Sequence, residues 1–283
     1  MKIVRILGGL GNQMFQYAFY KALEKKESKV LADLSLFKDY ELHNGFELDK
    51  VFGVDIKKAS QFTVDLYDTQ NRKWLFRKLR KLLKLKNTYK EEANEFVFDP
   101  TFLTDPSPRL YYGYWQNEGY FKDSDIRSEF VFKNPLTGKN NYTFKQIAES
   151  QSISIHVRRG DYVDHPLLGS LCNVTYYQDA ISLMNSKISN PSYFVFSNDI
   201  EWCKKNLPLN KATYIDWNTG RDSYIDMQLM STCKHQIIAN SSFSWWGAWL
   251  NNNPKKIVIA PKKWISTQES SISNILPDTW ISI

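Results

Sequence analysis

The feature that most constrains this chain is a regular alternation of short apolar runs and amphipathic stretches from about residue 152 onward. The runs have the length and the β-branched and aromatic content of buried strands, and the stretches between them have helical spacing. The expected strands are 152–157, 193–196, 213–215, 236–239 and 256–259, and the expected helices are 175–186, 199–206, 222–233 and 242–251. Strands that alternate with helices predict a parallel sheet with crossover helices, an α/β fold.

The start of the chain has the same organisation on a smaller scale. It reads as a strand, a glycine turn, a helix and a second strand, at 3–7, Gly8–Gly11, 13–26 and 29–32. This is a βαβ unit, and 283 residues leave room for two domains of ordinary size. We therefore predict two Rossmann-like domains facing across a cleft, at 1–148 and 149–283, the first with a basic helical insertion at about 72–90.

Positive charge is concentrated in that insertion. The chain has 37 Lys and Arg against 30 Asp and Glu, a formal net charge of +7. Nine basic residues and no acidic residue lie between 71 and 90, so the rest of the chain is slightly acidic. Leucines recur there at helical spacing, with the cations opposite them, at Leu75, Leu79, Leu82 and Leu83.

Two interpretations of this predicted helix stay open. In the first, the apolar stripe packs against its own domain and leaves a solvated basic face. In the second, the helix at 72–86 makes peripheral contact with an anionic membrane. A nucleic-acid partner is not favoured, because the basic residues are confined to one helix rather than spread over a face with stacking residues.

Targeting and redox signals are absent from the sequence. The apolar run at Met1–Leu10 is too short for a signal peptide, and no run approaches the ~20 apolar residues of a membrane span. The cysteines, Cys172, Cys203 and Cys233, form no CxxC pair and are odd in number. These observations predict a cytoplasmic protein with reduced thiols.

The glycine turn at the first strand is a candidate ligand site. Backbone N–H groups in such a turn approach ligands closely, and the following helix start favours negative charge. The pattern lacks the Gly-Lys-Ser/Thr of a P-loop and the third glycine of a dinucleotide fingerprint. A structural tight turn stays an alternative, but Asn12 and Gln13 add two amides that can bind sugar hydroxyls or a phosphate.

A second candidate is His156-Val-Arg-Arg-Gly-Asp161, at the carboxyl end of an expected strand. Open α/β sheets bind ligands at that edge. Strand alternation places His156 and Arg158 on one side and Arg159 on the other, so one arginine faces a ligand with its bidentate fork. The other arginine is expected to form a structural ion pair with Asp161, and a plain salt-bridged turn is the alternative for the whole segment.

Three further segments end strands or begin helices with polar residues. Asn198 follows the strand at 193–196, Asp226 lies one turn inside a helix, and Asn240 to Phe243 precede a helix rich in tryptophan. Taken alone, Asp226 reads as a surface residue and the tryptophans as core. No histidine or cysteine spacing suggests a metal site.

Three long motifs of the sequence resemble those of one protein family. Gly8-Gly-Leu-Gly-Asn-Gln-Met-Phe-Gln-Tyr-Ala18, His156-Val-Arg-Arg-Gly-Asp-Tyr162 and Ala239-Asn-Ser-Ser-Phe-Ser-Trp-Trp-Gly-Ala248 are similar to motifs of the α-1,2-fucosyltransferases of glycosyltransferase family eleven. The linking segments Gly113–Gln116 and Phe196–Asp199 match bacterial members that build O-antigens. The resemblance covers nearly the whole chain and is weakest at about 35–105.

The resemblance implies a GT-B fold that binds GDP-fucose mainly through its C-terminal domain. It further implies inverting transfer of fucose to O2 of a terminal galactose, without a metal or other cofactor. Galactose as the acceptor comes only from the resemblance, and whether the acceptor is lipid-linked stays open. A non-catalytic sugar- or nucleotide-binding protein and a fucosyltransferase of another linkage stay as alternatives. The expected location is cytoplasmic. In the second interpretation of the basic helix, this helix lies on the inner membrane face.

The resemblance also assigns roles to residues. It places Arg158 on the donor phosphates, His156 and Asp226 on guanine, and Asn12 near the acceptor oxygen. Asp161 and Asp164 are weak candidates for a general base. The full donor set is Gly9, Gly11, Asn12, His156, Arg158, Asn198, Asp226, Asn240, Ser241, Ser242 and Phe243. The expected acceptor residues are Gln13, Trp115 and Gln116.

Overall fold

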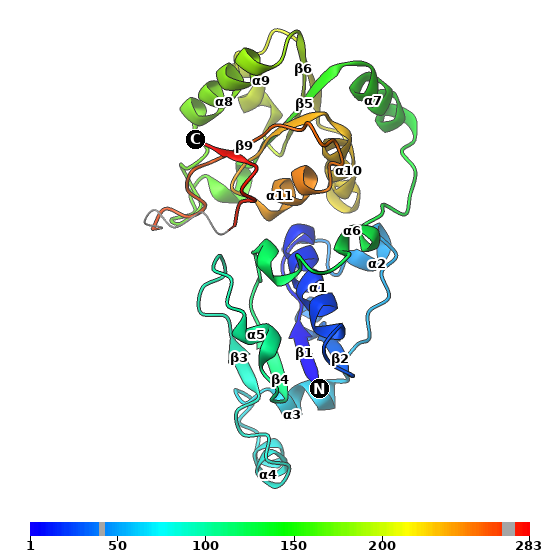
Figure 1. Ribbon diagram of the computed structural model, residues 1–283, viewed down its shortest axis with the longest axis vertical. Helices are drawn as coiled ribbons and strands as arrows, with labels where there is room; N and C mark the ends of the chain where they lie inside the picture. Colours follow the sequence, from blue (N-terminus) through cyan, green and yellow to red (C-terminus); the bar gives the residue numbers. More distant parts are fainter. Residues whose placement is uncertain (40–42, 268–274) are drawn as a thin grey trace. The chain divides into compact units, whose positions relative to one another are not determined.

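The computed structural model describes residues 1–39, 43–267 and 275–283, and the chain divides into two compact units. The first unit is Met1–Lys133 and the second is Asn134–Ile283. Each contains one sheet in which every described strand pair is parallel (Figure 1). This confirms the predicted α/β class.

The first unit is built on a four-stranded sheet of order β2-β1-β4-β3. Its strands are β1 (Lys2–Arg5), β2 (Val30–Asp33), β3 (Tyr89–Glu91) and β4 (Arg109–Tyr112). Its helices are α1 (Leu10–Glu24), η1 (Ser35–Asp39), α2 (Leu48–Val51), α3 (Gln61–Tyr67), α4 (Trp74–Leu82), α5 (Thr101–Thr104), η2 (Glu118–Tyr120) and α6 (Ile126–Glu129). Because β1, β4 and β3 are parallel neighbours, the segments that follow them lie at one edge of the sheet.

The second unit is built on a six-stranded sheet of order β10-β9-β8-β5-β6-β7. Its strands are β5 (Gln151–Val157), β6 (Pro191–Ser197), β7 (Ala212–Ile215), β8 (His235–Ile237), β9 (Val258–Ala260) and β10 (Ile281–Ser282). Its helices are α7 (Gly138–Glu149), η3 (Gly160–Tyr162), α8 (Val174–Lys187), α9 (Ile200–Asn206), η4 (Gly220–Asp222), α10 (Tyr224–Thr232) and α11 (Ser242–Trp249). Every strand and helix predicted from residue 152 onward is present.

The division between the units differs from the predicted boundary at 148/149. It falls between Lys133 and Asn134, because α7 packs against β5 and α10 of the second unit. Only two side chains of α7, Thr143 and Ile147, are buried, so its sequence has few apolar residues at helical spacing. Such a weak apolar pattern did not reveal which domain the helix belongs to.

The basic helix is shorter than predicted, and residues other than its leucine stripe attach it to its own domain. It spans Trp74–Leu82, and its buried residues are Phe76 and Arg80. The prediction that its leucine stripe packs against its own domain was wrong for most of that stripe, since Leu75, Leu82 and Leu83 are 51%, 78% and 52% exposed. Every helix among the described residues is too short or too polar to cross a bilayer.

Candidate active site

His156 lies at the carboxyl end of β5, the strand between β8 and β6 in the second sheet. Its side chain is 7% exposed, and the buried Nδ1 has no hydrogen-bond partner among the residues that the structure describes. Burial, together with the nearby charge of Arg158, lowers the pKa of His156 to about 3. The imidazole is therefore neutral near pH 7 and keeps a polar nitrogen for a ligand.

The two arginines after β5 have different surroundings. The Arg159 Nε donates to Asp199 Oδ2 at 3.0 Å, and its guanidinium lies 4.3 Å from the Trp202 ring centre. The sequence had pointed to Asp161 as the partner of the structural arginine, whereas this contact is with Asp199; the side chain of Asp161 lies outside the described part of the structure. The Arg158 guanidinium instead lies 5.5 Å from the Tyr162 ring centre.

The turn after Arg159 is held by Asn198, which follows β6. Asn198 Oδ1 accepts from the backbone N–H of Arg159 at 3.0 Å. A Cβ atom on Gly160 would lie 2.2 Å from Asn198 Nδ2, so any larger residue there must push this amide aside. These contacts give Asn198 a positioning role for the arginine turn, and its direct contact with a donor stays a prediction.

We expect Gly160→Ala to lower stability, because the new methyl group displaces Asn198 and breaks its bond to the Arg159 N–H. One lost hydrogen bond costs about 1 kcal/mol, which corresponds to a fall of about 2–4 °C in Tm for a chain of this size. Thermal unfolding of a double-mutant cycle with Asn198→Ala checks this. The same alanine should cost almost nothing once the amide is absent, and an equal loss in both backgrounds would contradict the proposed clash.

The start of α11 lies beside His156. The ring of Phe243 is 5.6 Å from that of His156, centre to centre, and Ser242 begins the helix. Backbone N–H groups in the first turn of a helix favour an anion. The segment Ser241–Phe243 therefore brings phosphate-binding chemistry to the same sheet edge as Arg158.

Asn240 is used within the protein. Its Nδ2 donates to the carbonyls of Leu168 and Trp264, at 3.2 and 3.0 Å, and its Oδ1 accepts from Cys172 Sγ at 3.4 Å. These bonds tie the end of the β8 segment to two loops. Asn240 is therefore a positioning residue. The core interpretation of the tryptophans is confirmed for Trp245 and Trp246, which are fully buried.

Asp226 lies in the first turn of α10, which packs against α11. Its Oδ1 accepts from Asn218 Nδ2 at 2.7 Å, and Asn218 in turn bonds to Asn140. Burial raises the pKa of Asp226 to about 7, although the bond from Asn218 opposes this. Ionisation of this carboxyl is costly, and one amide bonds to it. These are the properties expected of a group that binds N–H donors of a ligand.

In the first unit, the β1–α1 turn presents Asn12 at the carboxyl edge of the sheet. Gly8 has a φ of +81°, and a Cβ there would lie 2.9 Å from Asn12 Nδ2, so the turn requires glycine. Gly9 caps α1, and Gly11 is buried in its first turn. Both glycines thus have roles in shaping the turn.

The Gln13 amide is directed at the backbone rather than outward. Its Nε2 donates to the carbonyls of Gly8 and Gly45, each at 2.8 Å, and its Oε1 accepts from the Glu47 N–H at 2.9 Å. Both amide hydrogens are used inside the first unit. Gln13 therefore holds the segment at 45–47 against the turn, which is a positioning role.

Gln116 and Trp115 follow β4 at the same edge and differ from each other. Gln116 Nε2 donates to Asn12 Oδ1 at 3.0 Å, and within the described part of the chain its buried Oε1 has no hydrogen-bond partner. The Trp115 ring is fully buried and stacks on Phe19 with 4.1 Å between ring centres. Its faces cannot stack on a sugar, which leaves Gln116 as the residue of this pair with an oxygen for a ligand.

Glu92 directly follows β3 and is not among the residues predicted from the sequence. Its Oε2 accepts from the N–H groups of Tyr114 and Trp115, at 2.8 and 2.9 Å. Burial raises the pKa of Glu92 to about 7. The bonds hold Trp115 at its left-handed φ of 56°. The strand before Glu92 has only three residues, so the sequence carries little signal for this position.

The structure gives little support to Asp164 as a candidate general base. Asp164 is exposed in the turn after η3. In the part of the chain that the structure describes, no group of three His, Cys, Asp or Glu side chains is placed to hold a metal ion. The three cysteines are unpaired with one another.

Comparison with known proteins decides the family. The profile of Glycosyl transferase family 11 matches residues 1–283. An Escherichia coli alpha-1,2-colitosyltransferase is 35% identical over 291 residues, which cover 99% of this chain and 98% of that protein. The chain belongs to glycosyltransferase family 11.

Two further relatives bear on the chemistry of this family 11 glycosyltransferase. The O-antigen biosynthesis glycosyltransferase WbnK of Escherichia coli is 31% identical, with 98% of each chain covered. The galactoside alpha-(1,2)-fucosyltransferase 1 of Saimiri boliviensis boliviensis is 27% identical over 137 residues, 44% of this chain and 37% of that one. Family membership, predicted from the three motifs, is confirmed, and the fucosyl specificity stays a prediction.

Proposed function

We propose that this glycosyltransferase moves L-fucose from GDP-β-L-fucose to O2 of a terminal galactose, with inversion and without a metal. The observation that carries the proposal is the grouping of Arg158, the neutral His156 and the start of α11 at one sheet edge of the second unit. This set offers a bidentate cation, helix amides and a neutral ring to a nucleoside diphosphate. The donor domain is accordingly proposed to be the second unit.

The proposed mechanism rests on where charge develops. As the bond between fucose and phosphate breaks, negative charge grows on the departing diphosphate and positive charge on the sugar ring. Arg158 and the first N–H groups of α11 stabilise the diphosphate charge. Asp226 accepts the N1–H and N2–H of guanine, and His156 makes the second guanine contact.

The acceptor is proposed to bind the first unit. Asn12 and Gln116 are linked by a hydrogen bond of 3.0 Å, and Gln116 Oε1 is left to accept from a sugar hydroxyl. Gln13 holds the turn that carries Asn12, and the buried Trp115 fixes the backbone at Gln116. The acceptor hydroxyl attacks opposite the leaving diphosphate, and Asp161 and Asp164 stay the proposed candidates for a general base.

Colitose is a second donor candidate, because the relative named as an alpha-1,2-colitosyltransferase is 35% identical over nearly the whole chain. Colitose is fucose without its 3-hydroxyl group, so GDP-colitose carries the same nucleotide and sugar configuration. A site that hydrogen-bonds the 3-hydroxyl of fucose strongly rejects the deoxy analogue, whereas a site that does not bond it accepts both. The ratio of kcat/KM for the two donors therefore distinguishes them.

The test incubates the purified chain with GDP-fucose or GDP-colitose and a panel of β-galactosides. We expect a product heavier by one deoxyhexose, sensitive to an α-1,2-specific fucosidase, and a higher kcat/KM for GDP-fucose. Reactions without galactoside measure background hydrolysis. A preference for GDP-colitose would reassign the donor, a resistant product would indicate another linkage, and GDP binding without transfer to any galactoside would contradict the proposal.

A further inference from the structure

Helix α4 presents large apolar side chains to solvent. Trp74, Leu75, Leu82 and Leu83 are 65%, 51%, 78% and 52% exposed, and Phe62 of the neighbouring α3 is 55% exposed. The ring of Phe62 lies 5.6 Å from that of the buried Phe76. A run of exposed apolar residues on one short helix is unusual for a surface that meets only water.

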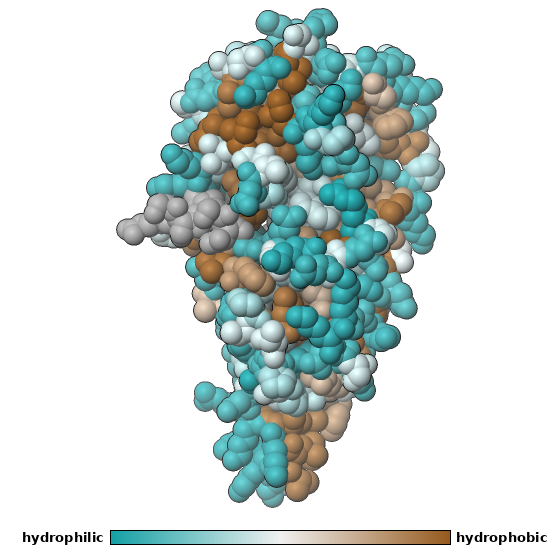
Figure 2. All heavy atoms as spheres, in the orientation of Figure 1, coloured by the Kyte–Doolittle hydropathy of each residue, from teal (hydrophilic) through white to brown (hydrophobic). Residues whose placement is uncertain are grey.

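Cations share the outward side of the same helix. At 100° per residue, Leu75 and Leu82 occupy one sector, and Arg77 and Lys81 lie well apart from them around the helix. Lys78 lies between these sectors, with its Nζ 4.0 Å from the Trp74 ring centre. Figure 2 shows hydrophilic and hydrophobic side chains divided between two sides of the region that α4 forms.

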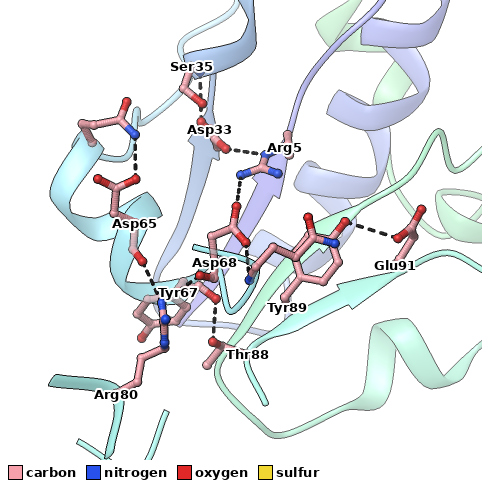
Figure 3. Close-up of polar contacts among 12 residues, drawn as sticks. Arg5, Asp33, Ser35, Asp65, Tyr67, Asp68, Arg80, Thr88, Tyr89 and Glu91 are labelled. Atoms are coloured by element: carbon pink, nitrogen blue, oxygen red, sulfur yellow. Dashed lines mark hydrogen bonds and ion pairs between the residues drawn. The ribbon is translucent and has the colours of Figure 1, made fainter. Parts of the chain in front are cut away.

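The inward side of α4 is already used. Phe76 is buried. The Arg80 guanidinium donates to the carbonyls of Asp65 at 3.0 Å and Asp68 at 2.7 Å (Figure 3), and it also donates to the carbonyl of Asn71. Asp68 is also bonded to Arg5, which ties this junction to β1. The exposed face is therefore held outward by a fixed attachment, and Arg80 does not belong to the outward charge.

We propose that the outward face of α4 docks this enzyme on an anionic lipid bilayer. The segment 71–90 has eight basic residues besides Arg80 and no acidic one, which is complementary to an anionic surface. Leucine and tryptophan enter the boundary between headgroups and acyl chains, while lysines and arginines extend to the phosphates. The apolar groups of this helix match the acyl region of such a surface, and the neighbouring cationic groups match its phosphates.

Within the first unit, the position of α4 leaves the candidate acceptor residues uncovered. Residues 83–88 connect α4 to the amino end of β3, and Figure 1 shows the helix beyond the amino ends of the strands of the first unit. Asn12 and Gln116 lie at the opposite, carboxyl edge of that sheet. A bilayer bound to α4 therefore does not cover these residues.

Sedimentation with vesicles tests the proposal on the full chain. We expect binding to vesicles of phosphatidylcholine with phosphatidylglycerol, weaker binding to phosphatidylcholine alone, and a loss of binding as salt is raised. Lys78→Glu with Lys81→Glu should weaken binding to the anionic vesicles about tenfold or more. Leu75→Ser with Leu82→Ser should weaken it by a similar factor, because less apolar surface enters the boundary.

Matched changes elsewhere control for charge and polarity alone. Lys145→Glu with Lys187→Glu makes the same charge change on exposed lysines, and Val131→Ser with Tyr142→Ser removes exposed apolar groups. Both pairs should bind anionic vesicles like the unmodified chain, and all four variants should keep its Tm. Equal binding by the α4 variants and their controls would contradict the proposal, as would α4-dependent binding to poly(U) RNA without binding to anionic vesicles.

Discussion

Arg158→Ala is expected to lower kcat for sugar transfer by about 10²–10³-fold, the loss found when one preorganised contact to a developing charge is removed. In the proposed mechanism, Arg158 meets the charge that grows on the departing diphosphate, so the loss falls on kcat more than on KM for the donor. Arg158→Lys keeps the positive charge but lacks the bidentate fork, and an intermediate rate is expected. Steady-state transfer to a galactoside measures all three enzymes.

The neighbouring arginine supplies the matched control. Arg159 is the same residue type in the same turn, but it pairs with Asp199 and lies over the Trp202 ring. Arg159→Ala should therefore lower Tm and reduce kcat by less than about tenfold, because it disturbs the turn without touching the diphosphate. Turnover near that of the unmodified enzyme in Arg158→Ala, or equal losses at both positions, would refute the assignment.

Asp226→Asn is expected to weaken GDP binding by about 10²-fold at pH 8, since an amide cannot accept both N–H groups of guanine as a charged carboxylate does. In the free protein, burial raises the pKa of Asp226 to about 7. The group must be ionised to accept both bonds, so GDP affinity should fall about tenfold per unit as pH drops below about 7 and level off above it. Asp226→Asn should remove this dependence.

Calorimetric titration of GDP at several pH values makes this measurement. Inosine diphosphate lacks the exocyclic amine of guanine, so the unmodified enzyme should prefer GDP and the variant should lose most of that preference. His156, with a pKa of about 3, does not titrate in this range. Glu92→Gln is the matched control, because it removes a carboxyl with a pKa of about 7 from the first unit and should leave the GDP profile intact.

The same substitution has an opposite effect on stability. The pKa of Asp226 is higher in the folded chain than its ordinary value of 3.8. Its favourable contribution is thus complete at low pH and is lost as pH rises through about 7. Asp226→Asn should raise Tm at pH 8 and change it little near pH 4. Weaker GDP binding together with higher stability would identify Asp226 as a carboxyl that binds the ligand. Unchanged GDP affinity would contradict its proposed contact with guanine.

Some site residues were recognisable because the sequence carries their signal locally. His156 lies at the end of a strand, Arg158 directly follows that strand, and Asn12 begins the helix after another strand. Polar residues at the ends of parallel strands meet at one sheet edge. Glu92 follows a strand of only three residues, too short to be recognised, so its role at the same edge was missed. The partner of Arg159 was also misjudged, because Asp199 lies 40 residues away and only the parallel pairing of β5 and β6 brings it near.

By itself, the sequence determined the α/β class, the alternation of elements and the family, because strand and helix periodicity and long motifs are properties of neighbouring residues. Only the tertiary structure decided which polar groups are already used. Gln13, Asn198 and Asn240 bond within the protein. His156 Nδ1 and Gln116 Oε1 have no partner in residues 1–39, 43–267 and 275–283. It also decided that Leu75 and Leu82 of α4 face outward, since Phe76 and Arg80 occupy the inward side. Burial and pairing depend on residues far apart in the chain, and no local pattern records them.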